Sequence, residues 1–193
     1  EITGKDLVKE QIYIAEGKAL SFKQEDLKII GHSMEVRVYA ENPKENFLPE
    51  TGRLVTYKVP QGPGVRVDDG FEEGMDIPIY YDPMISKLIT FGANREQARM
   101  RMLRAIEEYD ITGLSTTLDF CAFALKHDAF ISGKFDTKFV QTHFKPEMLD
   151  THNEEEEQIA IALAAYLLEE KKKTSNAVGK DGQMSKWKLR VNQ

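Results

Sequence analysis

One arginine in this chain occupies a position that would suit a catalytic or binding residue, on the polar face of a predicted strand. Residues 34–40 alternate between apolar and polar side chains, the period-two pattern of a strand with one buried face, and the polar positions are Glu35, Arg37 and Tyr39. Arg37 therefore points away from the core. It is either a solvated arginine paired with a neighbouring acid such as Glu35, or a fixed cation facing a site where negative charge develops.

Four short sequences around this strand occur in an order and at a spacing that are informative together. They are Gly31-His32-Ser33-Met34-Glu35-Val36-Arg37, Asn46-Phe47-Leu48-Pro49, Pro63-Gly64-Val65-Arg66-Val67-Asp68 and Tyr80-Tyr81-Asp82-Pro83-Met84-Ile85-Ser86-Lys87-Leu88. They resemble the C-terminal domain of biotin carboxylase, and the resemblance runs from Thr3-Gly4-Lys5-Asp6-Leu7-Val8 to about Thr142. The last of the four is most similar to the propionyl-CoA and acetyl-CoA carboxylase branch.

The resemblance implies a role for Arg37. Biotin carboxylases use ATP and bicarbonate to make carboxyphosphate, which supplies the carbon dioxide that carboxylates the ureido nitrogen of biotin. Loss of a proton from that nitrogen pushes negative charge onto the ureido oxygen. A guanidinium suits this charge, because it stays protonated and carries rigidly spaced donors. The family assigns this part to the arginine of its Glu-x-Arg strand, which is Arg37 here.

Four further residues are implicated by the resemblance, each with a structural alternative. Asp82 and Lys87 either line the active-site cleft or brace it. Thr137 and Lys138 match a position that approaches the adenine of ATP in the family, and the alternative is a helix start with Asp136 as its cap.

Arg66 matches a dimer-contact arginine of the family. The alternative is a loop arginine paired with Asp68 or Asp69, an interaction worth little on a surface. In the branch that this chain resembles, the enzyme often works inside a larger assembly, so a simple homodimer is one arrangement among several.

The resemblance also implies cofactors and partners. The cofactors are biotin on a carrier protein and ATP with Mg²⁺ or Mn²⁺, the nucleotide being bound mainly by an ATP-grasp half that this sequence lacks. The implied partners are the N-terminal and ATP-grasp domains of the same enzyme, a biotin carboxyl carrier protein or domain, a carboxyltransferase subunit and a second copy in a homodimer. The implied location is the bacterial cytoplasm or the mitochondrial matrix. Without the ATP-grasp half we expect no activity.

Two alternatives to this function stay open. The domain could be a non-catalytic module for dimerisation or docking of a carrier protein. It could equally belong to a carboxylase that acts on pyruvate or another acyl-CoA, because the acceptor is chosen by a carboxyltransferase that is not in this chain.

Composition argues against several other classes of protein. A formal charge of −6 over 193 residues argues against a dedicated nucleic-acid surface, and no stretch approaches the roughly 18 apolar residues of a membrane span. The single cysteine, Cys121, lies in an apolar run and is predicted to be a small core residue. The four histidines lack a metal-ligand spacing: His32, His127, His143 and His152. The chain begins at Glu1 without a signal-peptide pattern, so we expect a fragment of a longer protein.

Cap residues and apolar periodicity predict the elements that position Arg37. Four helices are expected: Thr3 to Gly17 with Thr3 as cap, a helix capped by Asn94 with Arg95, Glu96, Arg99, Arg101 and Arg104 on its polar face, Thr116 to Lys126, and a short one within 133–142. Strands are expected at 34–40, 53–59, 64–68, 77–81 and 85–91. The predicted fold is α+β, an antiparallel sheet with flanking helices of rudimentary hybrid-barrel type.

A change of composition predicts a boundary near Pro146. Residues 1–147 are predicted to form the biotin carboxylase C-terminal domain, and 148–193 a helical extension with a flexible tail. Acids at 154–157 precede an apolar run at 159–168 and three lysines at 171–173, which is the charge order that a helix dipole favours.

Overall fold

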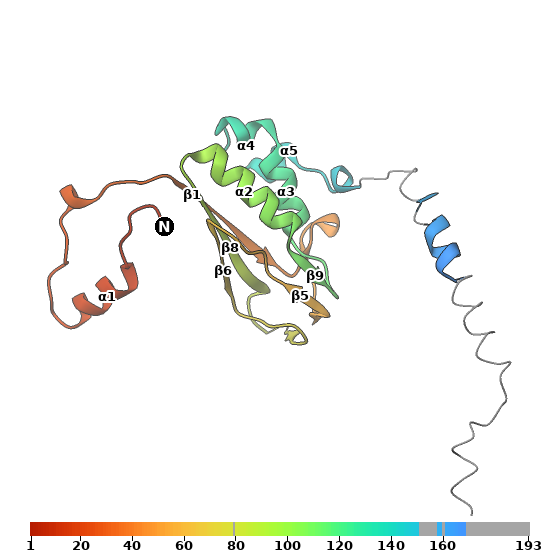
Figure 1. Ribbon diagram of the computed structural model, residues 1–193, viewed down its shortest axis with the longest axis horizontal. Helices are drawn as coiled ribbons and strands as arrows, with labels where there is room; N and C mark the ends of the chain where they lie inside the picture. Colours follow the sequence, from red (N-terminus) through yellow and green to blue (C-terminus); the bar gives the residue numbers. More distant parts are fainter. Residues whose placement is uncertain (79, 151–157, 160, 169–193) are drawn as a thin grey trace, which may run out of the picture. The chain divides into compact units, whose positions relative to one another are not determined.

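Short strands and helices alternate along the first part of the chain (Figure 1). The structure, a computed structural model, describes residues 1–78, 80–150, 158–159 and 161–168. The chain divides into two units, Glu1–Leu149 and Asp150–Gln193. The elements of the first unit are α1 (Leu7–Ala15), η1 (Gln24–Asp26), β1 (His32–Tyr39), β2 (Glu41–Asn42), η2 (Pro43–Glu45), β3 (Leu48–Pro49), β4 (Gly52–Arg53), β5 (Thr56–Lys58), β6 (Val65–Asp69), β7 (Asp76–Ile77), β8 (Met84–Gly92), α2 (Arg95–Glu107), β9 (Asp110–Thr112), α3 (Leu118–Lys126), α4 (Asp128–Ser132), α5 (Phe139–His143) and η3 (Pro146–Leu149).

A three-stranded antiparallel sheet with the order β1-β8-β6 is the centre of the first unit. Smaller antiparallel pairs form between β2 and β3, β4 and β7, and β5 and β9. The predicted α+β class is confirmed. None of the sheets formed by the described strands closes on itself, so the barrel-like arrangement that the resemblance implied is not formed there.

One face of this sheet is buried against α2. Val36, Val38 and Leu88 point inward from β1 and β8 and are at most 9% exposed. They join Met102 and Ala105 of α2 in one core cluster, and Figure 1 shows α2 lying over these strands. Burying a large apolar side chain contributes about 1.5–3 kcal/mol, so this layer holds β1 and β8 in register.

Side-chain caps explain where the first two helices begin. Asn94 caps α2 as predicted, and its side chain accepts a hydrogen bond from the N–H of Gln97 at 2.9 Å. The prediction for the first helix was wrong, because Asp6 and not Thr3 is the N-cap of α1. The Asp6 carboxylate accepts the N–H of Lys9 at 3.0 Å. With Asp6 as its cap the helix starts later, and it is shorter than the predicted span to Gly17.

Arg99 corrects the predicted polar face of α2. It is only 8% exposed, donates to the carbonyl of Leu125 at 2.9 Å and pairs with Glu96 at 2.6 Å. A long arginine can lie along an apolar surface while its guanidinium is fully paired, and here it satisfies a carbonyl at the end of α3. Periodicity registers only the charge of Arg99, so it placed this residue in solvent.

The third helix begins two residues later than predicted. Thr116 accepts the N–H of Leu118 at 3.4 Å, and Thr117 is the N-cap of α3. The Thr117 side chain makes no capping bond to the helix, although threonine is a preferred capping residue. Its hydroxyl is bonded to β1 instead.

Two other segments differ from their predicted boundaries. The predicted helix within 133–142 is found only as α5, and the preceding helix α4, which was not predicted, ends at Gly133 with a left-handed φ of 73°. The predicted strand at 77–81 is reduced to β7, while the strand at 53–59 is split into β4 and β5. These strands are two or three residues long, and alternation over so few residues is a weak signal.

The second unit contains the predicted C-terminal helix. Residues 158–159 and 161–168 are helical, and the apolar side chains among them are exposed: Ile159, Ile161, Leu163, Tyr166, Leu167 and Leu168. The predicted acidic run and the tail after residue 168 lie outside the described residues. Within the described parts of the chain, no helix is long and apolar enough to cross a membrane.

Replacing Arg99 by alanine should destabilise the fold. The change leaves the Leu125 carbonyl without its donor and removes a packed side chain, so the free energy of unfolding should fall by about 1–3 kcal/mol. Urea unfolding measures this value. The matched control is Arg104→Ala on the same helix, where the exposed pair with Glu108 contributes little. Equal effects of the two changes would contradict the buried role of Arg99.

Cys121 should be unreactive in the folded protein. It packs against the core cluster, and burial raises the pKa of its thiol to about 12. The reactive thiolate is therefore scarce at pH 8. Iodoacetamide should label Cys121 slowly in buffer and at the rate of an ordinary thiol in urea. Fast labelling without denaturant would show that the segment is open.

Candidate functional site

The face of the central sheet opposite α2 carries charged residues in two rows. In the first row Arg37 of β1 lies opposite Lys87 of β8, which lies opposite Asp68 of β6. In the second row Glu35 and Arg66 lie on either side of Ile89. Residues paired across an antiparallel sheet share one face, so β1, β8 and β6 present cations and acids together.

A shallow cavity of about 380 Å³ opens on this face. Its lining combines the second row and part of the first with the start of the chain: Glu1, Ile2, Ser33, Met34, Glu35, Arg66, Asp68, Lys87 and Ile89. Arg37 is not one of the residues that line it. The lining thus mixes two cations with three carboxylates and a few apolar side chains. Such a surface suits a small polar ligand that can both donate and accept hydrogen bonds.

Arg37 is held by its two neighbours on the same face of β1. Its side chain is 59% exposed, and Nε lies 3.3 Å from Oε1 of Glu35. Hydrogen bonding to Tyr39, and then to Glu35, raises the pKa of the Arg37 guanidinium. The structure shows the pair with Glu35 that one interpretation of the sequence described, and it leaves the guanidinium exposed. Arg37 pairs with Glu35, and it also remains a permanent cation on an open face.

Asp82 lies at the same end of the β1–β8 pair as Arg37, beyond the last register pair. Its carboxylate accepts the N–H of Met84 at 3.1 Å, at the start of β8. Burial, and then the nearby charge of Asp82, raises the pKa of Glu41. Asp82 thus both shapes the turn into β8 and adds negative charge to this end of the sheet.

Arg66 takes the alternative that the sequence analysis described. Its guanidinium makes two bonds to the Asp68 carboxylate, at 2.7 and 2.8 Å. It also lies 3.4 Å from Glu1. Hydrogen bonding and charge from Asp68, followed by Glu1, raise the pKa of Arg66. The side chain is still 59% exposed, so a contact with a second molecule is sterically open to it.

Thr137 and Lys138 lie apart from the sheet, in the turn before α5. Both are exposed, and Lys138 is the N-cap of α5. Asp136 was proposed as the alternative cap, but its carboxylate instead accepts the N–H of Lys138 at 2.9 Å. The neighbouring cavity of about 340 Å³ is lined by Phe135 and other residues of this segment. No described contact joins this segment to the first row of charged residues, Arg37, Lys87 and Asp68.

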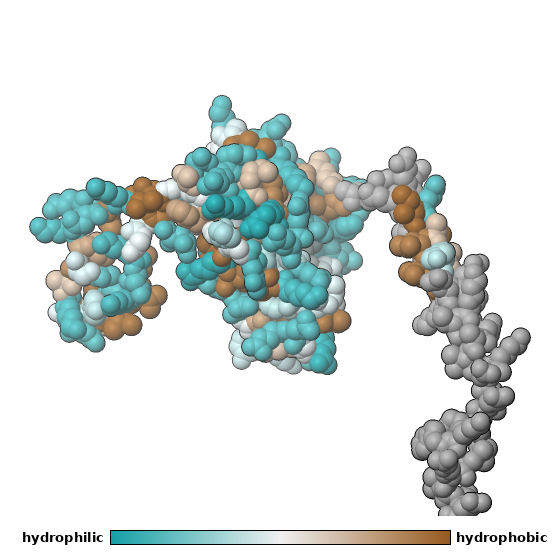
Figure 2. All heavy atoms as spheres, in the orientation of Figure 1, coloured by the Kyte–Doolittle hydropathy of each residue, from teal (hydrophilic) through white to brown (hydrophobic). Residues whose placement is uncertain are grey.

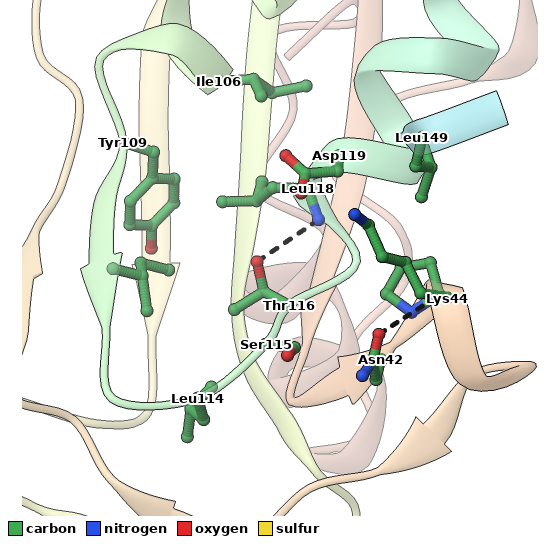
Figure 3. Close-up of a pocket in the computed structure, with 12 residues that line it drawn as sticks. Asn42, Lys44, Ile106, Tyr109, Leu114, Ser115, Thr116, Leu118, Asp119 and Leu149 are labelled. Atoms are coloured by element: carbon green, nitrogen blue, oxygen red, sulfur yellow. Dashed lines mark hydrogen bonds between the residues drawn. The ribbon is translucent and has the colours of Figure 1, made fainter. Parts of the chain in front are cut away.

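A further cavity, which the sequence did not predict, is shown in Figure 3. Its volume is about 450 Å³, and its lining comes from the β2–η2 segment, the end of α2, β9 and the start of α3. Several of its polar groups already make hydrogen bonds within the protein. Asn42 accepts the N–H of Lys44 at 3.0 Å, and Ser115 donates its N–H to Glu50 at 2.7 Å. We assign no chemistry to this cavity.

Buried hydroxyl groups form a network beneath the charged face. The Tyr109 hydroxyl lies 2.7 Å from that of Ser86 and 2.8 Å from that of Tyr57. Burial is the main cause that raises the pKa of the Tyr109 hydroxyl far above its ordinary value. These hydroxyls are therefore neutral and structural, and they anchor β8 next to Lys87. Alternation in the sequence had no means of finding this network.

The sequence that forms this charged face matches a known protein family. Residues 35–142, more than half of the chain, match the family model described as the biotin carboxylase C-terminal domain. The chain belongs to the biotin carboxylase C-terminal domain family. The matched range contains Arg37, Arg66, Asp82, Lys87, Thr137 and Lys138.

Relatives of this biotin carboxylase domain share four to five residues in ten with it. Biotin carboxylase 1 of Bacillus subtilis (strain 168) is 49% identical over 142 residues, which cover 74% of this chain and 32% of that protein. The mitochondrial propionyl-CoA carboxylase alpha chain of Homo sapiens is 44% identical over 172 residues, which cover 86% of this chain and 24% of that protein.

A solved structure shares the fold of the biotin carboxylase domain. It is the biotin carboxylase domain dimer of 2-oxoglutarate carboxylase from Hydrogenobacter thermophilus, in complex with MgADP, ADP and bicarbonate. The TM-score is 0.73 at 41% identity, covering 79% of this chain and 33% of that one. The chain thus spans about a third or less of the length of the relatives that it matches.

Removing the Arg37 side chain should leave the fold intact. An exposed ion pair contributes little to stability, and Arg37 lies outside the core cluster. The urea midpoint of Arg37→Ala should therefore equal that of the unmodified protein within error, in contrast to Arg99→Ala. A large fall in the midpoint would identify Arg37 as a structural residue of the sheet.

Proposed function

We propose that this chain is the part of a biotin carboxylase that supplies Arg37 to the carboxylation of biotin. The observation that carries the proposal is the placement of this residue. A guanidinium oriented by Glu35 and Tyr39 stands on the open face of a rigid strand, in one row with Lys87. A preorganised cation of this kind is suited to an oxygen that becomes negatively charged during the reaction.

The charged face fits the ureido group of biotin. When bound, biotin would supply a ureido nitrogen that accepts the carboxyl group. Arg37 would bind the ureido oxygen and stabilise its charge as the nitrogen loses its proton, and Glu35 would keep the guanidinium plane fixed. Lys87, beside Arg37 in the register, would add positive potential to the same site. Asp82 would line the end of the site.

The nucleotide and its metal ion belong elsewhere in this proposal. Within the described residues no three His, Cys, Asp or Glu side chains are grouped so that they could hold a metal ion. We therefore assign ATP and its Mg²⁺ or Mn²⁺ to an ATP-grasp half that this sequence lacks. Thr137 and Lys138, exposed at the start of α5, would approach the adenine. On this proposal the chain alone is inactive.

The partners follow from the same reasoning. The domain of residues 1–147 would dock on the N-terminal and ATP-grasp domains, and would receive biotin from a carrier protein or domain. The extension of residues 148–193 would lead toward the module that holds the partner subunit, the carboxyltransferase. Arg66, still open to solvent, would reach a second copy in a dimer. We place the enzyme in a bacterial cytoplasm or a mitochondrial matrix.

The acceptor of the carboxyl group is proposed from the sequence around β8. Tyr81 to Leu88 resembles the branch that carboxylates propionyl-CoA or acetyl-CoA, and we propose one of these two. The names of the relatives include a propionyl-CoA carboxylase and a 2-oxoglutarate carboxylase at similar identities. Assay of the complete enzyme with each acceptor in turn decides among them.

Arg37→Lys tests the proposed chemistry. Lysine keeps the charge but loses the planar fork of donors, so biotin-dependent turnover in a full-length subunit that carries this chain should fall by about 10²-fold or more. Bicarbonate-dependent ATP cleavage, with and without free biotin, is the measurement. Turnover within a few-fold of the unmodified enzyme would sink the proposal and favour a docking module.

A further inference from the structure

Thr117 holds the backbone on both sides of Val38, the residue that follows Arg37. Its hydroxyl donates to the carbonyl of Arg37 at 3.1 Å and accepts the N–H of Tyr39 at 3.1 Å. Its own N–H donates to the carbonyl of Tyr39, also at 3.1 Å. One residue, about 80 positions away in the sequence, therefore makes three hydrogen bonds to two residues of β1, Arg37 and Tyr39.

These bonds occupy an edge of the sheet that no strand covers. In the order β1-β8-β6, β8 is the one strand among the described residues that pairs with β1, so every second backbone N–H and C=O of β1 faces outward. Thr117 is 5% exposed, and an unmet backbone group beside it would be costly. The hydroxyl therefore does for Arg37 and Tyr39 what a neighbouring strand would do.

These three hydrogen bonds, which we call the Thr117 clamp, lie where the strand is irregular. The register between β1 and β8 shifts between Val38 and Tyr39, and such irregularities change the direction in which nearby side chains point. Arg37 and Tyr39 flank this shift, and Tyr39 is a hydrogen-bond partner of the Arg37 guanidinium. A backbone without the clamp could take more than one conformation here.

The Thr117 side chain makes these bonds in place of its usual role. Thr117 is the N-cap residue of α3, yet its side chain makes no bond to the helix end. A threonine at this position commonly accepts a helical N–H. Here the capping bond is absent, and the hydroxyl donates one hydrogen bond to β1 and accepts one from it. Its remaining partner is the Cys121 thiol of α3.

We propose that Thr117 is a positioning residue for Arg37: it fixes the backbone from Arg37 to Tyr39 and so aims the guanidinium at the biotin site. The inference rests on the proposed function of Arg37. Misplacing a reacting group by about 1 Å can cost about 10²-fold in rate, so loss of the clamp should be visible in turnover.

The test compares Thr117→Val with Thr117→Ser in the full-length subunit. Valine keeps the shape but removes both bonds of the hydroxyl, whereas serine keeps them. Valine should lower kcat for biotin-dependent ATP cleavage by about 10-fold or more, with bicarbonate-dependent cleavage in the absence of biotin retained. Serine should restore most of the loss. Amide hydrogen exchange at Tyr39 should be faster in the valine variant alone.

Thr90→Val is the matched control for general destabilisation. Thr90 is also fully buried, and its hydroxyl donates to the carbonyl of Ala98 at 2.9 Å. It makes no bond to residues 37–39, so this variant should keep biotin-dependent turnover. Thr117→Val placed on Arg37→Lys should cause little further loss, because both changes act through the same guanidinium.

Three results would overturn the inference while leaving the function of Arg37 intact. They are full turnover of Thr117→Val beside a defective Arg37→Lys, an equal loss in Thr90→Val, or a full additional loss on the Arg37→Lys background. Normal turnover of Arg37→Lys itself would instead refute the proposed function. The exchange rate at Tyr39 reports the clamp independently of activity.

Discussion

The antiparallel pairing of β1 with β8 is the constraint on which the rest of the site depends. One face of this pair is closed by α2, with Val38, Leu88 and Met102 fully buried. Because side chains alternate along a strand, burying Val36 and Val38 forces Arg37 onto the opposite face. A slip of the register by one residue would bury the guanidinium and expose the core. The packing of the core therefore determines the direction of the arginine.

Hydrogen bonds at the ends of the elements complete this arrangement. The buried Arg99 satisfies the last turn of α3, and Thr117 at the first turn of the same helix satisfies the edge of β1. Helix α3 is thus connected at one end to α2 and at the other to the strand that carries Arg37. Helix α1, by contrast with the buried core residues, exposes apolar side chains such as Leu7 and Ile12, and Figure 2 shows hydrophobic residues on this part of the surface.

Much of this arrangement could be predicted from the sequence, and the failures have physical causes. Alternation placed Arg37 outward, and the Asn94 cap located α2, because both signals are local. Arg99 was assigned to solvent because periodicity cannot detect a carbonyl that needs a donor. Thr117 was missed because its partners on β1 are far away in the sequence. The proposed reaction came from the resemblance to biotin carboxylase, because the pattern of residues alone does not indicate it.

The most direct measurement of the central claim is ATP cleavage by the full-length subunit carrying Arg37→Ala, with bicarbonate alone and with bicarbonate plus free biotin. The account predicts that the stimulation by biotin is lost, while the slower cleavage that needs only bicarbonate survives. That result would place the guanidinium at the biotin step. Equal stimulation by biotin in the variant and the unmodified enzyme would contradict the account, and would leave this domain with a supporting or docking role.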